Sequence, residues 1–424
     1  MSKTAKKIIL YIVIAITFVG TFFSGYYLRY FLMDSEMRAV YDILNKYKKY
    51  YYYDDGDLER EISHAILDKY STYYTKEEYS EIKNSRMGNT SGIGITFNNK
   101  TLQIVEVSGN SPAEKAGVRR GGYLRAVKVY QDFIEIKNGE QLSDVLSGIP
   151  NNIEFTISVE YSYESNMLYT LKKQNYKQTF VHYYDNLGFY GYSDKSGEFE
   201  LEKLDTLSMV SSDDSDTAVI DYDSFYGTES GVKGSYGQIE GFLNKFKEDN
   251  KKNLIIDLRD NGGGYMDILC DISSFFVDVE RGERADVAVA VDKYDNKLTY
   301  KSKPSKYSDY NYQNIIILAN EYSASASEAF IGAVLDYDKN NIVKVLVASS
   351  IVDDKIVYKT YGKGIMQSTY LNADGSAIKL TVAEIFWPVS NTCIHDKGII
   401  GKSEGKILGV DKNEVYNKAF ELLK

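Results

Sequence analysis

The stretch N-I-I-I-L-A-N-E-Y-S-A-S-A-S-E, which runs from Asn314 to Glu328, decides how the second half of the chain folds. Its first six residues, Asn314–Ala319, are mostly apolar and rich in β-branched side chains, which is typical of a buried strand. The residues that follow Glu328 have the apolar spacing of a helix. The serines therefore lie at a strand-to-helix turn, where a hydroxyl can be exposed beside backbone N–H groups that are still unpaired.

A second segment, Y-G-K-G-I-M-Q at Tyr361–Gln367, offers complementary chemistry. A serine hydroxyl becomes a nucleophile only when a base removes its proton. Lys363, between two glycines, can be that base if its ammonium is desolvated. Its pKa must then fall by about 3 units, from ~10.4 to near 7. Gln367 is placed four residues further on, where it can orient the amine without adding charge.

Each segment also has an ordinary structural interpretation. Ser325-x-x-Glu328 matches a helix capping box, which requires no catalysis. Gly-Lys-Gly is common in turns. The catalytic interpretation is therefore based on the two segments together rather than on either alone.

The two segments, S-A-S-A-S-E and G-K-G-x-x-Q, resemble motifs of the C-terminal processing (tail-specific) peptidases, which are serine peptidases with a Ser–Lys dyad. The resemblance implies that Ser325 is the nucleophile, Lys363 the base and Gln367 the residue that holds the base. The family usually has about 25 residues from serine to lysine, whereas here 363 − 325 gives 38. About 13 extra residues are therefore expected between them, most simply within Asp338–Lys355.

A glycine-rich stretch, D-L-R-D-N-G-G-G at Asp257–Gly264, resembles the family's D-L-R-G-N-P-G-G. Glycines let the backbone approach a substrate closely, and their N–H groups can point at a developing oxyanion. The resemblance implies that Gly263 forms the oxyanion hole with the backbone N–H of Ala326. A phosphate loop would need a lysine and a Ser/Thr that are missing, and the acidic spacing does not fit a calcium loop. On its own, the glycine run would be interpreted as a turn.

A further stretch, S-G-I-G-I-T at Ser91–Thr96, begins a segment that resembles a PDZ domain of the kind found in this family, up to about Lys173. Free backbone N–H groups in such a loop can hold a carboxylate while the peptide adds as an extra strand. An ordinary hairpin turn is the alternative for a lone G-x-G. The expected peptide-binding residues are Gly92, Ile93, Gly94 and Ile95.

The remaining patterns define an α/β (α+β) multidomain fold. A strand at Thr217–Phe225, a helix at Tyr236–Phe246 and a strand at Leu254–Leu258 predict a βαβ crossover. The polar segment Asn186–Asp216 is expected to be an irregular connection, and Thr75 is expected to cap a helix. The predicted domains are a cytoplasmic stub and transmembrane anchor at 1–30, a helical arm at 31–90, a PDZ domain at 91–175 and a serine peptidase domain at 176–424.

The N-terminal run Ile8–Leu28 contains no charged residue and is long enough to span a bilayer. Lys3, Lys6 and Lys7 precede it, so the N-terminus is expected to stay in the cytoplasm and the rest to be exported. The run is longer than a typical signal-peptide core and shows no small-x-small cleavage site, which favours an uncleaved anchor. We therefore expect a single-pass cell-membrane protein with an extracytoplasmic catalytic domain.

Composition argues against several other classes of protein. The net charge of −10 over 424 residues argues against a nucleic-acid partner. Cys270 and Cys393 are too few for a disulfide framework or a zinc site, and no H-E-x-x-H motif is present, so we expect neither a metal nor a cofactor. None of the three histidines, His64, His182 and His395, lies in a catalytic motif, although chain distance alone does not exclude a triad.

The resemblance implies a membrane-anchored serine endopeptidase that cuts protein or peptide substrates near their free C-termini, with the PDZ domain capturing the tail or gating the site. Pairing of two copies through the helical arm is suggested by analogy. The alternative is a catalytically impaired pseudo-peptidase that binds C-terminal tails, if the extra residues displace Lys363. A membrane-tethered scaffold that uses only its helical arm is a third possibility.

Overall fold

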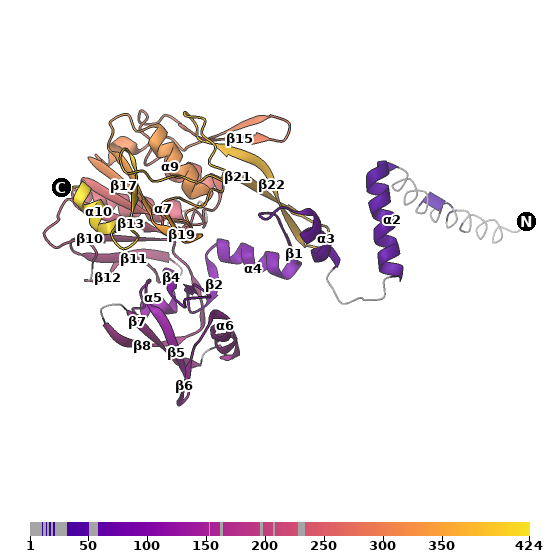
Figure 1. The fold of residues 1–424 in the computed structure, drawn as a ribbon, viewed down its shortest axis with the longest axis horizontal. Coiled ribbons are helices and arrows are strands. Elements are labelled where there is room, and N and C mark those ends of the chain that lie inside the picture. The colour runs from indigo at the N-terminus through magenta and orange to yellow at the C-terminus, as the bar shows by residue number, and fades with distance from the viewer. Residues whose placement is uncertain are drawn as a thin grey trace, which may run out of the picture. The chain divides into compact units, whose positions relative to one another are not determined.

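The structure is a computed structural model that describes residues 11, 14, 17, 20–21, 32–50, 58–151, 153–161, 164–195, 198–206, 208–227 and 234–424 (Figure 1). The chain divides into two compact units, Met1–Ala65 and Ile66–Lys424. Helix α2 (Ser35–Tyr50) lies in the first unit, and α3 (Leu58–Ile66) ends at the boundary, as the apolar spacing predicts.

Most of the predicted membrane anchor at Ile8–Leu28 lies outside the described residues. Among the residues that are described, no helix combines the length and the apolar character needed to cross a bilayer.

The second unit contains a small lobe, defined here as residues 89–177. Its strands are β2 (Asn89–Gly92), β3 (Ile95–Phe97), β4 (Ile104–Val107), β5 (Tyr123–Val129), β6 (Asp132–Glu135), β7 (Glu154–Tyr161), β8 (Glu164–Lys172) and β9 (Gln174–Lys177), and its helices are α5 (Pro112–Lys115) and α6 (Gly139–Gly148). The lobe has its own apolar core, in which Leu124, Leu142 and Ile157 are fully buried. The PDZ assignment of residues 91–175 remains a prediction.

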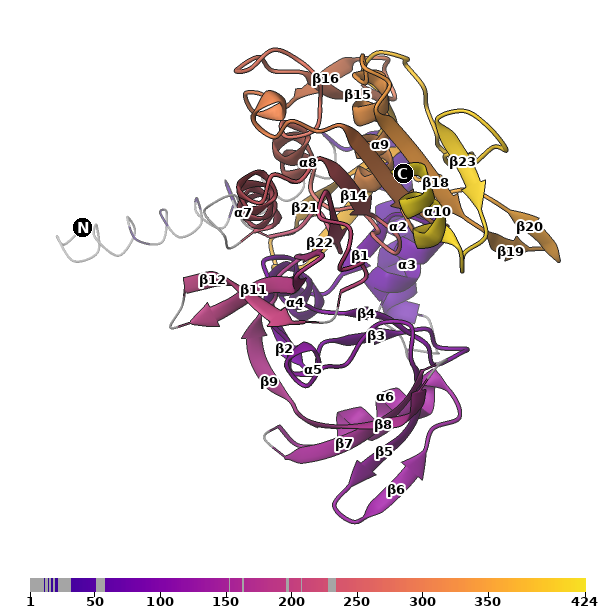
Figure 2. The ribbon, with the colours of Figure 1, turned by 90° about the vertical axis from the view of Figure 1, so that its left-hand side faces the viewer.

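The core of the second unit is an eight-stranded sheet, and the small lobe lies below it in Figure 2. The strand order is β12-β11-β10-β13-β14-β17-β18-β23. Its elements are β10 (Val181–Asp185), β11 (Gly188–Lys195), β12 (Glu198–Asp205), β13 (Thr217–Tyr222), α7 (Ser235–Glu248), β14 (Asn253–Asp257), α8 (Met266–Ser273), β17 (Asn314–Ala319), α9 (Ala326–Asp336), β18 (Val343–Ala348), β23 (Ile407–Val410) and α10 (Val415–Leu422).

Strands β13 and β14 pair in parallel and are joined through α7, so the predicted βαβ crossover is confirmed. Strand β17, which is the predicted strand at Asn314–Ala319, is buried on both faces. Ile315 and Ile317 pack in the core that includes α7, α8 and α9, whereas Ile316 and Leu318 pack in the core that includes α10. This arrangement explains why the strand is a continuous apolar run rather than an alternating one.

The prediction for Asn186–Asp216 was wrong, because β11 and β12 occupy most of that segment and form the edge of the large sheet. Tyr192 and Phe199 are buried there, while charged residues such as Glu200 lie beside them in the sequence. An edge pair of strands needs few apolar residues, so its polar composition resembles that of a loop.

A second sheet supports the later segments. It consists of β1 (Thr72–Tyr74), β22 (Ala377–Phe386), β15 (Asp286–Asp292) and β16 (Lys297–Lys301), with β21 (Ile365–Leu371) also paired to β22. Helix α4 (Lys76–Arg86) follows β1 and begins with the predicted cap at Thr75, which forms a capping box with Glu78. The remaining described elements are a 3-10 turn, η2 (Tyr307–Asp309), and a hairpin of β19 (Ser350–Val352) and β20 (Lys355–Val357).

Candidate active site

Ser325 occupies a strained turn between β17 and α9. It is the N-cap residue of α9, with φ 58° and ψ −113°. Non-glycine residues rarely adopt a positive φ, and such strain persists only where the surrounding structure enforces it. The backbone N–H of Ser325 donates to Glu328 Oε2 at 3.0 Å, which helps to hold this conformation.

A cavity of about 360 Å³, termed here the catalytic cavity, is lined by both Ser325 and Lys363. Gln367 and Ala326 also line it. No hydrogen bond joins Ser325 Oγ to Lys363 Nζ within the described part of the chain. The structure therefore places the two predicted catalytic side chains in one cavity without a hydrogen bond between them.

Lys363 has the electrostatic environment that a lysine base requires. Burial lowers the pKa of Lys363 to about 8, helped by the positive charges of Lys379 and Arg86 and opposed by Glu328. Its Nζ lies 5.9 Å from the ring centroid of Tyr70. A substantial fraction of this lysine is therefore neutral near pH 8.

Glu328 connects the segments that carry these two residues. Its fully buried carboxylate accepts hydrogen bonds from Thr360 Oγ1 at 2.5 Å and from the N–H groups of Gly362 and Lys363 at 2.8 and 2.9 Å, in addition to the bond from Ser325. Burial raises the pKa of Glu328, and these hydrogen bonds act in the opposite direction. The sequence indicated only a helix cap at this position.

The side chain of Gln367 forms a hydrogen bond with the segment at Tyr70 in this structure. Its Nε2 donates a hydrogen bond to the backbone carbonyl of Tyr70. Among the described residues, no hydrogen bond joins Gln367 to Lys363. In this structure Gln367 instead anchors the segment that places the Tyr70 ring near the lysine.

The predicted oxyanion-hole residues lie together, but their N–H groups differ in availability. Gly263 has φ 97°, and a Cβ at this position would lie 2.9 Å from Ser325 Cβ and 2.8 Å from Ala326 N, so only glycine fits. The N–H of Ala326 has no acceptor among the described residues. The N–H of Gly263, in contrast, donates to Asn261 Oδ1 at 2.9 Å and is therefore already paired within the chain.

Asn261 was missed as a site residue. Its buried side chain also donates to the carbonyl of Tyr222 at 2.8 Å, and its own carbonyl accepts hydrogen bonds from Ser327 Oγ and the N–H of Ala324. Asn261 thus ties the glycine loop to the start of α9. Its position in the D-N-G-G-G stretch was the one indication in the sequence that it belongs to the site. Its hydrogen-bond partners Tyr222 and Ser327 are too distant in the sequence to be inferred.

A second cavity, of about 750 Å³, extends from the small lobe to the glycine loop. Gly262 and Gly263 line it, and so do all four predicted peptide-binding residues, Gly92, Ile93, Gly94 and Ile95. Arg86, Tyr226 and Gly262 line both this cavity and the catalytic cavity. The structure therefore places the predicted peptide-binding loop next to the predicted catalytic site.

Charged side chains connect the small lobe to the core. Arg120 forms ion pairs with Asp260 and, at 3.4 Å, with Asp221. His182 Nε2 lies 2.5 Å from Glu114 Oε1. Burial acts to lower the pKa of His182, but the neighbouring carboxylate of Glu114 outweighs it and raises the pKa to about 9.

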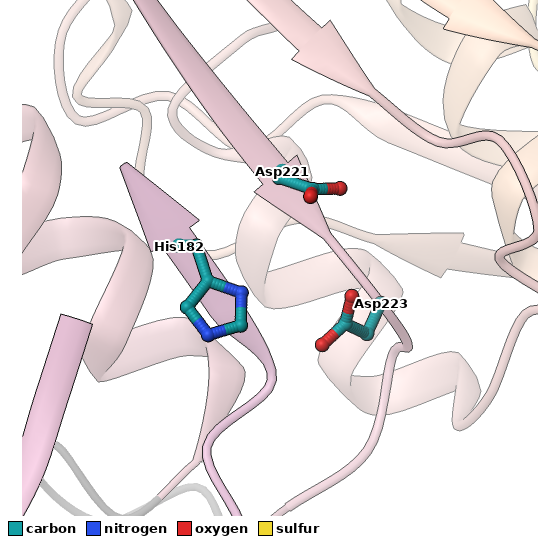
Figure 3. Close-up of side chains that lie close together, drawn as sticks. All are labelled: His182, Asp221 and Asp223. Atoms are coloured by element: carbon teal, nitrogen blue, oxygen red, sulfur yellow. The ribbon is translucent and has the colours of Figure 1, made fainter. Parts of the chain in front are cut away.

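His182 lies close to Asp221 and Asp223, with one potential ligand atom from each residue within 4.8 Å of the others (Figure 3). Such a group can in principle hold a cation. His182 is paired with Glu114, however, and Asp221 with Arg120, so partners within the chain already account for two of the three groups. We assign this cluster to ion pairing and no metal to it.

The histidines give no support for a Ser–His–Asp triad in the described residues. Neither His182 nor His395 lines the catalytic cavity, and no hydrogen bond joins either to Ser325. The ring of His395 lies 5.8 Å from that of Tyr70. The side chain of His64 is outside the described part of the structure.

Comparison with known proteins identifies the family to which one segment of the chain belongs. Residues 216–402 match the sequence profile of Peptidase family S41. This segment contains the glycine loop, Ser325 and Lys363 and is a domain of that family of serine-type peptidases. The family assignment made from the motifs is therefore confirmed.

Two curated relatives carry the description "Probable CtpA-like serine protease". The one from Staphylococcus aureus (strain COL) is 27% identical over 377 residues, covering 86% of this chain and 63% of the relative. The one from Staphylococcus saprophyticus is 25% identical over 376 residues, covering 86% of this chain and 64% of the relative. The chain thus spans less than two thirds of the length of these relatives.

Among solved structures, a putative S41 protease from Bacteroides fragilis has a similar fold. It aligns with a TM-score of 0.52 and 12% sequence identity, covering 87% of this chain and 86% of that structure.

Proposed function

We propose that this chain is a serine endopeptidase that uses a Ser325–Lys363 dyad to cut protein substrates near their C-termini. The observation that carries the proposal is that a strained, cavity-facing serine and a lysine with a lowered pKa line the same cavity. Strain at a nucleophile and a perturbed pKa at a base are typical of active sites. Membership of the S41 family supports the same chemistry.

In the proposed mechanism, Ser325 Oγ attacks the scissile carbonyl carbon while neutral Lys363 Nζ takes the hydroxyl proton. The carbonyl oxygen becomes an oxyanion, which accepts hydrogen bonds from the N–H of Ala326 and from a second N–H in the loop at 262–264. Lys363 then gives its proton to the leaving amine. A water molecule, activated by the same lysine, hydrolyses the acyl-enzyme ester and releases Ser325.

The two side chains must come together for this reaction, because no hydrogen bond links them in this structure. The lysine side chain has four rotatable bonds, and hydrogen bonds in unliganded sites are often long before a substrate binds. The Glu328 bonds keep the two backbones in register while the lysine side chain turns toward the serine.

The small lobe is proposed to act as a PDZ domain that captures the C-terminal tail of the substrate or gates the site. Support comes from the second cavity, which runs from the loop at Gly92–Ile95 to Gly262 and Gly263. The uncharged run at Ile8–Leu28 supports a membrane anchor, with the catalytic domain outside the cytoplasm. A homodimer formed through the helical arm belongs to the same proposal.

A peptidase assay on the full-length protein tests the dyad. Ser325→Ala and Lys363→Ala should each lower kcat/KM by at least about 10³-fold, because the members of a catalytic unit act together. Either variant retaining wild-type turnover would rule the dyad out. Circular dichroism of each variant should match the wild type, which excludes unfolding as the cause.

The alternative is a pseudo-peptidase that only binds tails, and the missing Ser325–Lys363 hydrogen bond is the observation that favours it. In that case a serine-reactive fluorophosphonate probe would leave Ser325 unlabelled, while tail peptides would still bind. Labelling of the wild type that disappears in Ser325→Ala would exclude this alternative.

A further inference from the structure

The catalytic cavity has an unusual distribution of charge for a protein with a net charge of −10. Four basic residues, Lys83, Arg86, Lys363 and Lys379, line it. No aspartate or glutamate is among the described residues that line it. The cavity is therefore a concentrated positive region on an acidic chain, which attracts anionic ligands.

Three parts of the chain supply these basic groups, namely helix α4, strand β22 and the loop before β21 that holds Lys363. Helix α4 turns one face toward the cavity, with Tyr79, Ile82, Lys83 and Arg86 at the spacing of a helical stripe. Lys379 comes from β22, where it pairs with Thr369 of the neighbouring strand β21. Basic groups thus reach the cavity from the helix, from the sheet and from this loop.

In the described part of the chain, none of these cations forms an ion pair with a carboxylate. Within the described residues, no carboxylate lies within 4.0 Å of Arg86, Lys379 or Lys363. Arg86 lies over the ring of Tyr226, 5.4 Å from its centroid, and Lys379 Nζ lies 5.8 Å from that of Tyr74. Both side chains are half-buried, and a partly desolvated cation without a counter-charge is unfavourable.

The geometry points to recognition of a substrate carboxylate by Arg86 and Lys379 inside the catalytic cavity, close to the scissile bond. This inference rests on the proposed peptidase function and specifies its substrate class, which is a peptide with an anionic group beside the bond to be cut. The carboxylate can be the free C-terminus or an acidic side chain. Arg86 suits either source, since its planar guanidinium can bind a carboxylate through two hydrogen bonds.

The second cavity has no comparable excess of positive charge. Glu106, Asp223 and Asp260 line it together with Arg86 and Lys173. Arg86 lines both cavities, so a peptide that runs from one to the other passes this residue. The carboxylate is therefore bound more favourably in the catalytic cavity than deep in the second one.

Arg86 and Lys379 also act on the base. They are the positive groups that help to lower the pKa of Lys363, while Glu328 opposes them and the Tyr70 ring lies nearby. A bound carboxylate partly cancels their charge. Removing Arg86 should therefore weaken the preference for anionic peptides. It should also move the midpoint of the pH profile of cleavage to a higher pH. A purely structural role of Arg86 would change neither property.

The test uses one quenched fluorescent peptide in four forms. The peptide carries Glu or Gln within three residues of the cleaved bond, and each version has a free C-terminal acid or an amide. Cleavage is measured with the wild-type full-length protein, and binding is measured by fluorescence anisotropy with Ser325→Ala. We expect the anionic forms to be favoured by about tenfold over the neutral form, equivalent to about 1.4 kcal/mol.

Arg86→Ala and Lys379→Ala, each also combined with Ser325→Ala for binding, should reduce this preference to below about threefold. Lys247→Ala, which removes an exposed cation that lines neither cavity, should keep it. A preference that follows the acid-to-amide change identifies the C-terminal carboxylate as the ligand. A preference that follows the Glu-to-Gln change identifies the side-chain carboxylate as the ligand.

Equal binding of all four peptides would overturn the inference, even if the wild type cleaves them all and the peptidase function stands. An Arg86-dependent preference in binding, with no cleavage by the wild type, would support the inference and reject the peptidase function. The two proposals can therefore fail independently.

Discussion

The backbone N–H of Lys363 donates a hydrogen bond of 2.9 Å to the carboxylate of Glu328. The same carboxylate accepts the N–H of Ser325, so one buried side chain fixes the backbone at both ends of the proposed dyad. These two hydrogen bonds determine the relative position of Ser325 and Lys363 more than their separation in the sequence does. They explain how a chain with an unusually long connection can still bring both residues to one cavity.

Replacing Glu328 should therefore damage catalysis more than a helix cap alone would. We expect Glu328→Ala to lower kcat by at least about 10²-fold and to destabilise the protein by about 3 kcal/mol, since four donors, two of them buried, lose their acceptor. Assays of kcat and urea unfolding measure both effects. Glu280→Gln, at an exposed position, should change neither. Wild-type kcat in Glu328→Ala would show that the carboxylate is not needed for alignment.

The pH dependence of cleavage should report the titration of Lys363. The pKa of this residue is about 8, and only its neutral form can accept the proton of Ser325. We therefore expect kcat/KM to rise with pH through a midpoint near 8 and then to level off. Initial rates between pH 6 and 10 measure this profile. A rate that is flat across this range would argue against a lysine base.

Gly263→Ala should abolish activity through contact with the nucleophile. The added methyl group would lie within 3 Å of Ser325 Cβ and Ala326 N, at a backbone φ that disfavours alanine. Gly282 provides a matched control, because it also has a positive φ, of 86°, but has no atom within 4 Å of an added Cβ. We expect a loss of kcat of at least about 10²-fold only in Gly263→Ala, with a loss of stability of ~1–3 kcal/mol that exceeds that of Gly282→Ala. Equal effects of the two substitutions would assign the result to backbone strain alone.

The protein should lose stability in acid through Asp257, at the end of β14. Burial by itself would raise the pKa of this carboxyl group, but paired hydrogen bonds from Arg259 and one of 2.6 Å from Tyr416 lower it to about 2. Because this folded-state pKa lies below the usual 3.8, the contribution to stability is complete above about pH 4 and is lost as the pH falls through 2.

This contribution amounts to about 2 kcal/mol at neutral pH. Urea unfolding at pH 3 and pH 7 should show a smaller pH dependence in Asp257→Asn than in the wild type. Asp354→Asn, at an exposed turn, serves as the control and should keep the wild-type profile. An unchanged pH dependence in Asp257→Asn would disprove this assignment.

The sequence predicted those features that depend on neighbouring residues. Asn314–Ala319 could be recognised as a strand because both of its faces are buried, and Thr75 as a cap because its partner Glu78 is three residues away. The motifs also located Ser325 and Lys363, which line one cavity in the structure.

Features that depend on distant contacts could not be inferred in the same way. Glu328 binds the backbone of Lys363, which lies 35 residues further on, and Gln367 binds a carbonyl group 297 residues away. The N–H of Gly263 is occupied by a side-chain amide whose orientation depends on its bond to Tyr222. The strands β11 and β12 were missed because an edge pair can be almost entirely polar.

The catalytic cavity and the second cavity share three lining residues, Arg86, Tyr226 and Gly262. This shared lining has a consequence for the proteins that the chain could process. Under the proposed function, a polypeptide that reaches from the small lobe to Ser325 would have to be extended as a single strand, without hydrogen bonds to the rest of its own fold. A client whose last residues are folded into a stable helix or sheet must first unravel that end. The choice of substrate would then depend on the local stability of the substrate's C-terminal segment. Mutations far from the cleavage site that change this stability would change the rate of cleavage.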